Sequence, residues 1–151
     1  MTTLISEKDT EKTKKQIKIA KKPIIVVAQN NDYNRKMLEY GKFDILLSPE
    51  LVAIKDKPKQ LDSGLNSIMG RIASKNKIAI GINLKDIKQL NKKEKALRLA
   101  RIKQNIKICR KTNTKIKILN STNKSSVRAL LLSLGADTKQ TKTAISETIS
   151  F

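Results

Sequence analysis

The sequence predicts an α/β protein, an incomplete (β/α) barrel of the TIM type with a mostly parallel sheet. Continuous β-branched and apolar runs are typical of strands that are covered on both faces. Four such runs lie at 24–28, 43–47, 78–84 and 116–120. They alternate with helical patterns, which predicts parallel pairing through right-handed crossovers. A closed eight-unit barrel needs roughly 200 residues or more, so a chain of 151 residues predicts an open one.

Helical patterns fill the segments between and after these runs. Asn30 and its neighbours can begin a short helix that Gly41 ends. The longest helix has an apolar seam at three- and four-residue spacing, formed by Leu99, Ile102, Ile106 and Cys109. The other expected elements are helices near 66–75, 85–90 and 127–134, a helix from 138, and a closing strand at 148–151.

The charge balance is strongly basic, with 33 Lys and Arg against 13 Asp and Glu and a formal net charge of +20. Such a charge density repels itself unless a polyanion neutralises it, which makes nucleic acid the first partner to consider. The four aromatic residues are too few and too dispersed for a base-stacking platform. We therefore expect any RNA to be bound through its backbone and shape.

The composition argues against several kinds of catalysis. Without histidine there is no imidazole to act as a general base or to bind zinc. The single cysteine, Cys109, excludes an internal disulfide, and its apolar neighbours favour a buried thiol over a reactive one. The acids are scattered and no phosphate-binding glycine loop occurs. We expect no catalytic residue, metal or cofactor in this chain, no membrane span, and a cytoplasmic protein.

We divide the chain into a basic amino-terminal arm, residues 1–22, and a single α/β domain, residues 23–151. The arm has few apolar residues and is rich in lysine from position 12 onward. This composition fits either a frayed helix or a disordered segment. We favour a basic arm that becomes ordered when RNA binds.

The long helix is the first candidate site. Between 91 and 111 it carries nine basic residues and one acid, Glu94. Off the apolar seam, Arg98, Arg101 and Lys103 are expected to project outward beside Lys107 and Arg110. A plain solvated face usually mixes charges in i,i+4 pairs, and here the acids are missing. We favour phosphate contacts, which position RNA rather than read its sequence.

The segment from Asp62 to Asn66, which reads Asp-Ser-Gly-Leu-Asn, is the second candidate site. It ends an irregular stretch over 50–64, and long loops in compact domains are often functional. Taken alone, the pentapeptide favours a simple helix entry, with Asp and Ser as caps and Gly for an unusual backbone angle.

Several segments in order resemble one family, archaeal ribonuclease P protein component 3, whose fold is a metal-free PHP-like barrel. The first is Phe43-Asp44-Ile45-Leu46-Leu47-Ser48-Pro49-Glu50, and the second is Asp62-Ser63-Gly64-Leu65-Asn66, which is similar to the family's DSGxN motif. Further similarity covers 75–80, 98–112, 116–121, 124–130 and 134–135. Compared with the family, the amino-terminal βα units look shortened, with the first strand expected at Ile24.

The resemblance implies a non-catalytic subunit of ribonuclease P, the ribonucleoprotein endonuclease that removes the 5′ leader of precursor tRNA. The implied partners are ribonuclease P RNA, protein component 2, the other protein subunits and the precursor tRNA, with magnesium carried by the RNA. The resemblance implies that the DSGxN segment is a loop that contacts RNA, and we weigh this role equally with that of a helix cap. The expected RNA backbone contacts are Arg98, Arg101, Lys103, Lys107, Arg110, Lys111 and Lys124. A second RNA-binding patch is expected around the loop, formed by Lys59, Asp62, Ser63, Asn66, Lys75 and Lys77.

Two alternatives belong to other classes of protein. A ribosomal or other small ribonucleoprotein subunit shares the charge, the size and the lack of catalytic residues, but leaves the ordered motifs unexplained. A PHP-type metal-dependent phosphoesterase would need imidazole ligands, which the chain lacks.

Overall fold

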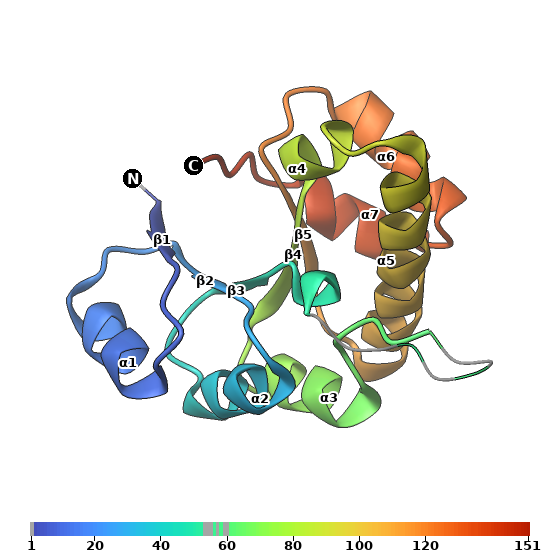
Figure 1. Cartoon of the computed structure of the whole chain (residues 1–151). Helices are drawn as coiled ribbons and strands as arrows, with labels where there is room; N and C mark the ends of the chain where they lie inside the picture. Colours follow the sequence, from blue (N-terminus) through green and yellow to red (C-terminus); the bar gives the residue numbers. More distant parts are fainter. Residues whose placement is uncertain (1, 53–55, 57, 59–60) are drawn as a thin grey trace.

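The computed structural model describes residues 2–52, 56, 58 and 61–151 (Figure 1). The elements follow in the order β1 (Thr3–Ile5), α1 (Thr10–Ile19), β2 (Ile24–Val27), α2 (Asn31–Tyr40), β3 (Ile45–Leu47), the 3₁₀ turn η1 (Pro49–Leu51), α3 (Ser67–Lys75), β4 (Ala79–Asn83), α4 (Leu84–Lys88), α5 (Lys92–Thr112), β5 (Ile116–Leu119), α6 (Lys124–Ser133) and α7 (Thr138–Ile145).

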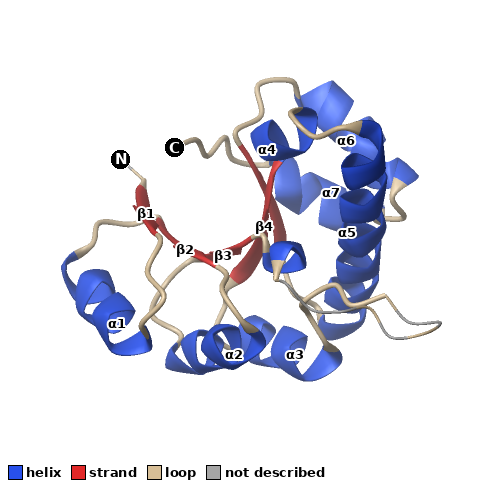
Figure 2. Cartoon of the chain, in the orientation of Figure 1, coloured by secondary structure: helices blue, strands red, loops and turns tan. Residues whose placement is uncertain are grey.

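The five strands form one parallel sheet in the order of the chain, β1-β2-β3-β4-β5. Ile25 is level with Ile45, and Ile45 is level with Ala79, so the strands advance in step. The sheet curves without closing, and the helices lie around its outer side (Figure 2). The predicted open α/β barrel is thus confirmed.

Both faces of the sheet are apolar. The outer face, with residues such as Val26, Leu46 and Ile80, packs against the helices in the main hydrophobic core. The alternate residues on the inner side, among them Ile25 and Ile45, form a smaller cluster of buried side chains. This double coverage explains why the strands appear as continuous apolar runs rather than as alternating patterns.

The amino-terminal segment differs from the predicted arm. Residues 3–5 form β1, an additional strand that pairs in parallel with β2. Helix α1 follows and is capped by Asp9, whose carboxylate accepts hydrogen bonds from the backbone N–H groups of Glu11 and Lys12. The prediction missed this βα unit because it buries so little, with only Thr13 and Ile17 of α1 in the interior. The first strand therefore lies well before Ile24.

The other predicted elements lie close to their expected positions. The main difference is at the carboxyl end, where the expected closing strand is a single parallel bridge between Leu119 and Ile149. None of the described helices is long and apolar enough to span a lipid bilayer.

Candidate nucleic-acid interface

Helix α5, with 21 residues, is the longest of the described helices and has an inner and an outer side. The Asn91 side chain accepts a hydrogen bond from the backbone N–H of Glu94 at its start, and Asn113 ends it in a left-handed conformation. The predicted seam is confirmed, since Ile102, Ile106 and Cys109 are buried. Leu99 packs against the same core at partial burial.

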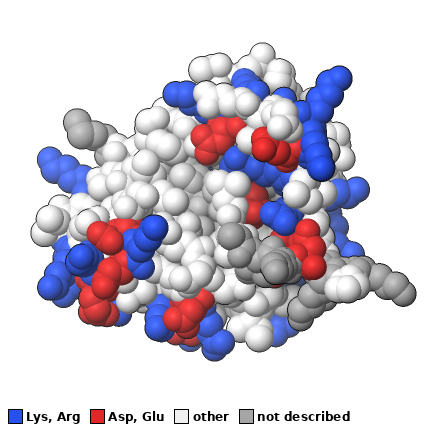
Figure 3. All heavy atoms as spheres, viewed as in Figure 1, with Lys and Arg blue, Asp and Glu red and all other residues white. Residues whose placement is uncertain are grey.

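The outer side of α5 carries cations that have no acidic partner. Lys103, Lys107 and Lys111 are exposed, and within the described part of the chain no carboxylate lies within 4.0 Å of their ammonium groups. On α2, by contrast, Arg35 pairs with Glu39 and Lys36 with Asp32. Figure 3 shows this contrast, with acidic and basic side chains mixed over α1 and α2 and basic ones along the margin over α5. Unneutralised cations on one face favour a polyanionic partner.

Arg98 does not project outward as predicted. Its side chain is only 5% exposed, and its Nε donates a hydrogen bond to Glu50 Oε1 at 3.1 Å. Its Nη2 donates to Ser48 Oγ at 3.3 Å and lies 4.0 Å from a carboxylate oxygen of Asp86. The physical reason is the buried Glu50 carboxylate, 1% exposed, which needs a cationic partner. Arg98 is therefore a structural residue and is removed from the predicted RNA contacts.

Burial raises the pKa of the Glu50 carboxyl above its ordinary value, and the positive charge of Arg98 opposes this effect. The pair joins two segments that are far apart in the sequence, the turn η1 after β3 and the first half of α5. It therefore holds α5 against the carboxyl end of β3.

Arg101 is also drawn toward the loop. Its guanidinium lies 3.2 Å from Asp56 Oδ2, and its side chain is 17% exposed. Asp56 Oδ1 also accepts a hydrogen bond from the backbone N–H of Asp62 at 2.8 Å. This hydrogen bond, followed by Arg101, lowers the pKa of the Asp56 carboxyl. Arg101 thus ties α5 to the residues just before the DSGxN segment, so its charge is already partly neutralised.

The segment from Asp62 to Asn66, hereafter the DSGLN loop, packs tightly on η1. Gly64 has a φ of +73°, and a Cβ at this position would lie 1.9 Å from the carbonyl oxygen of Pro49, so only glycine fits. Ser63 is fully buried, and its carbonyl oxygen accepts a hydrogen bond from Asn105 Nδ2 of α5 at 3.1 Å. Buried in this way, Ser63 is not positioned to contact RNA.

The expected capping of the helix by Asp62 and Ser63 is wrong, because the N-cap of α3 is Asn66, whereas Asp62 closes a turn within the loop and Ser63 is buried. Asp62 Oδ1 accepts a hydrogen bond from the Gly64 N–H at 2.9 Å, and Asn66 Oδ1 accepts one from the Met69 N–H at the start of α3. The simple interpretation of the motif as a helix entry is therefore part of its role. Asn66 is exposed and Asp62 half-buried, so both still present polar atoms outward.

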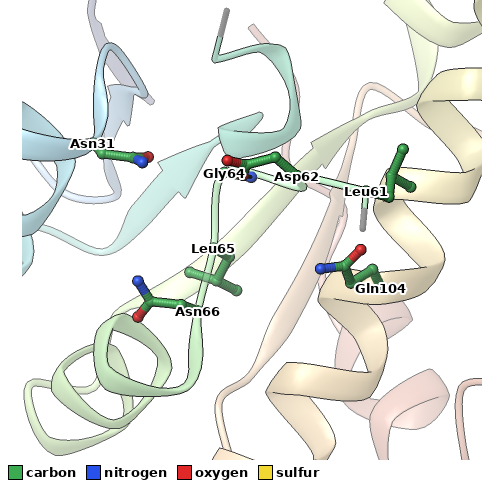
Figure 4. A pocket seen from close by; sticks show the side chains of 7 residues that line it. All are labelled: Asn31, Leu61, Asp62, Gly64, Leu65, Asn66 and Gln104. Carbon is green, nitrogen blue, oxygen red and sulfur yellow. Dashed lines mark hydrogen bonds between the residues drawn. The ribbon is translucent and has the colours of Figure 1, made fainter. Parts of the chain in front are cut away.

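A cavity of about 160 Å³ lies beside the loop. Figure 4 shows Asn31 at the start of α2 on one side of it and Gln104 of α5 on the other, with the loop between them. Its lining residues are Asn31, Leu61, Asp62, Gly64, Leu65, Asn66 and Gln104. Neither Asn31 nor Gln104 was predicted, because an isolated amide in a polar helix gives no signal in the sequence.

Lys75 and Lys77 do not join this loop as predicted. They lie at the far end of α3, whose nine residues span about 14 Å. There they approach the end of α5, because Ser74 Oγ donates a hydrogen bond to the Asn113 carbonyl at 3.1 Å. With two lysines from the end of α5 and from just before β5, they form a group of exposed lysines at the amino ends of β4 and β5. This group, hereafter the amino-edge cluster, consists of Lys75, Lys77, Lys111 and Lys115. Lys115 was missed because it follows the helix that carries the basic run.

Two further predicted residues lie elsewhere. Arg110 is exposed, and its Nη1 donates a hydrogen bond to the Gly135 carbonyl oxygen at 2.6 Å. Lys124 is exposed at the start of α6, at the opposite edge of the sheet from the amino-edge cluster. Lys59 lies outside the described residues.

The described residues hold no group of three or more His, Cys, Asp or Glu side chains that could bind a metal ion. Cys109 is a buried free thiol, as predicted, and burial raises its pKa to about 12. Fold and site together define a basic α/β scaffold, an open parallel sheet with exposed lysines on the outer side of α5 and in the amino-edge cluster.

Comparison with known proteins finds several that are similar to this chain. No protein-family model matches it. Ribonuclease P protein component 3 of Methanococcus maripaludis strain C6 is 29% identical over 117 residues, which cover 76% of this chain and 47% of the relative. The protein of the same name from Methanococcus vannielii is 30% identical over 90 residues, covering 60% of this chain and 36% of the relative. The chain spans about half the length of the curated relatives it matches.

The fold is also shared with a solved structure. A chain in the cryo-EM structure of archaeal ribonuclease P with mature tRNA superposes with a TM-score of 0.77 at 22% identity, over 96% of this chain and 64% of that one. The resemblance predicted from the sequence is confirmed: over about three quarters of its length this chain is similar to ribonuclease P protein component 3 of Methanococcus maripaludis, and its fold is that of a chain in archaeal ribonuclease P.

Proposed function

We propose that this chain is a protein subunit of archaeal ribonuclease P, and that it supports the catalytic RNA in removing the 5′ leader of precursor tRNA. The observation that carries the proposal is the alignment with ribonuclease P protein component 3 over 76% of the chain. The exposed lysines of α5 and of the amino-edge cluster provide the chemistry that such a role needs.

In this role the protein binds RNA without taking part in bond cleavage. Packing an RNA catalytic domain brings phosphates close together, and the exposed ammonium groups reduce that repulsion as they displace counterions. Magnesium ions held by the RNA supply the chemistry. The proposal includes protein component 2 as the direct protein partner, further protein subunits in the same particle, and a cytoplasmic location.

The buried contacts around α5 serve this role indirectly. A lysine-rich helix is held onto the sheet by one apolar seam and by the Arg98–Glu50 and Arg101–Asp56 pairs. Two cations therefore point inward, where they fix the helix, and three lysines of the outer side stay available for phosphate.

The test is a reconstitution of precursor-tRNA cleavage by the cognate ribonuclease P RNA at limiting magnesium. The reaction contains component 2 with or without this chain. We expect the chain to lower the magnesium concentration needed for cleavage. An unchanged magnesium requirement, with RNA and component 2 shown to be competent with a component 3 relative, would refute the proposal.

A further inference from the structure

We infer that the cavity beside the DSGLN loop binds one unpaired RNA nucleobase that carries an exocyclic amino group, in preference to uracil, with adenine and cytosine as the bases tested. The inference rests on the proposed function and deepens it, because it adds recognition of a base to contacts that otherwise involve only phosphates. Unpaired bases are the usual targets of sequence-selective RNA binding.

The size and walls of the cavity suit a base. Its volume is about 160 Å³, and a cavity of about 150 Å³ is large enough to hold a benzene ring. Leu61 and Leu65 supply apolar surface for the ring, whereas Asn31, Asp62, Asn66 and Gln104 supply polar groups.

The polar groups around the cavity have unused hydrogen-bonding capacity. Among the described residues, the side-chain amides of Asn31 and Gln104 make no hydrogen bond, and Asn66 uses only Oδ1. Asp62 uses only Oδ1, as acceptor for the Gly64 N–H. A carboxylate can only accept, so a base that offers an amino group satisfies Asp62, while the amides can pair with ring nitrogens and carbonyls.

The site is built before any ligand arrives. Gly64 lies against the Pro49 carbonyl, Asn105 holds the Ser63 carbonyl, and Asn66 caps α3. Because the loop already has a fixed backbone, little conformational entropy is lost when a base binds. Such fixation is what a recognition pocket requires and exceeds what a surface helix entry needs.

Cations for the neighbouring phosphates lie on the same helix. Lys107 and Lys111 are three and seven residues after Gln104, a spacing that places all three on one side of α5. Both lysines are exposed and have no acidic partner among the described residues. An RNA strand whose phosphates follow these lysines can therefore insert one base beside Gln104.

The test measures binding of the whole chain to short single-stranded oligoribonucleotides at one fixed salt concentration. The probes are oligo(rA), oligo(rC), oligo(rU) and an abasic ribose-phosphate oligomer of equal length. The pocket variants are Gln104→Ala and Asn31→Ala, the second at an exposed position whose side chain makes no hydrogen bond to the described residues. Gln16→Ala, which removes an exposed amide from α1, is the matched control.

We expect oligo(rA) and oligo(rC) to bind about tenfold more tightly than oligo(rU) and the abasic oligomer. Both pocket variants should lose this difference and keep the salt dependence of the native chain, whereas Gln16→Ala should change neither. Equal binding of all four oligomers, a preference for oligo(rU), or a base preference that survives both pocket variants would overturn the inference and leave the proposed function standing. Failure of every oligomer to bind would overturn the inference as well, and the cleavage reconstitution would then decide the proposed function separately.

Discussion

Arg98 Nε lies 3.1 Å from Glu50 Oε1, and both side chains are almost completely buried. The pair connects α5 to the turn that follows β3, across 48 positions of sequence. The net charge of the chain is +20, and α5 is rich in lysine and arginine. Even so, the Arg98 side chain of α5 points toward the interior. The pair explains how a helix with a short apolar seam is fixed to the sheet.

Replacing Arg98 with Met should destabilise the protein by about 3–5 kcal/mol, because the Glu50 carboxylate then remains buried without a partner. The measurement is the free energy of unfolding from urea denaturation. The control is the double variant Arg98→Met/Glu50→Met, which removes both charges and should recover most of the loss. The single variants Arg98→Met and Glu50→Met are measured in the same way. If the loss of unfolding free energy in the double variant equals the sum of their losses, packing and not the uncompensated charge is responsible.

The raised pKa of Glu50 predicts a specific dependence of stability on pH. The folded protein holds the Glu50 proton more tightly than the unfolded chain, whose carboxyl has its ordinary value of 4.5. Between that value and the higher folded pKa, the folded state binds more protons, so the contribution of Glu50 to stability decreases as the pH rises through this window.

The comparison with Glu50→Gln isolates this effect. Asp9 and Asp56 have lowered pKa values, so their contributions run in the opposite direction, but they are common to both proteins and cancel in the difference. We expect the free energy of unfolding of the native chain, minus that of Glu50→Gln, to fall as the pH rises above 4.5. A difference that is constant with pH would contradict the raised pKa.

Gly64→Ala should be among the most damaging single changes in the DSGLN loop. The alanine would have to adopt a left-handed backbone conformation, and its Cβ would lie 1.9 Å from the Pro49 carbonyl oxygen. Gly135→Ala is the matched control, since Gly135 also has a positive φ but nothing lies within 4 Å of its Cβ position. Gly135→Ala should cost about 1–3 kcal/mol from strain alone, and Gly64→Ala clearly more. Equal losses in thermal unfolding would mean that the contact with Pro49 does not constrain the loop.

Neutralising Lys107 and Lys111 together should weaken RNA binding and reduce the slope of log affinity against log salt by about two, one for each phosphate that is no longer neutralised. The control is Arg35→Ala/Lys36→Ala on α2, where both cations already pair with acids. That variant should leave the slope nearly unchanged. If the two double variants reduce the slope equally, the outer side of α5 is no preferred RNA surface.

Much of the fold was accessible from the sequence because it depends on local patterns. The apolar runs at 24–28 and 116–120 led to β2 and β5, and Asn30 and Gly41 marked the ends of α2. The βα unit formed by β1 and α1 was missed for the converse reason. It buries too few apolar side chains to stand out from a basic, lysine-rich segment.

The candidate site divides in the same way. Lys103, Lys107 and Arg110 were predicted from helical spacing to project outward, and they are exposed, whereas Arg98 and Arg101, predicted in the same way, turn toward carboxylates. The amino-edge cluster could not be foreseen, because it joins Lys75 and Lys77 to lysines more than thirty positions away.

The sequence by itself determined the open parallel α/β architecture, the caps of α2 and the excess of positive charge, because each follows from composition or from the spacing of neighbouring residues. Only the tertiary structure decided that Arg98 faces Glu50, that Gly64 lies against Pro49, and that Asn31 and Gln104 share one cavity. Helical periodicity specifies which side of α5 a residue occupies, but its partner on that side is set by the crossovers that bring distant segments together. A buried carboxylate 48 positions before Arg98 turns that cation inward, and no local pattern records it.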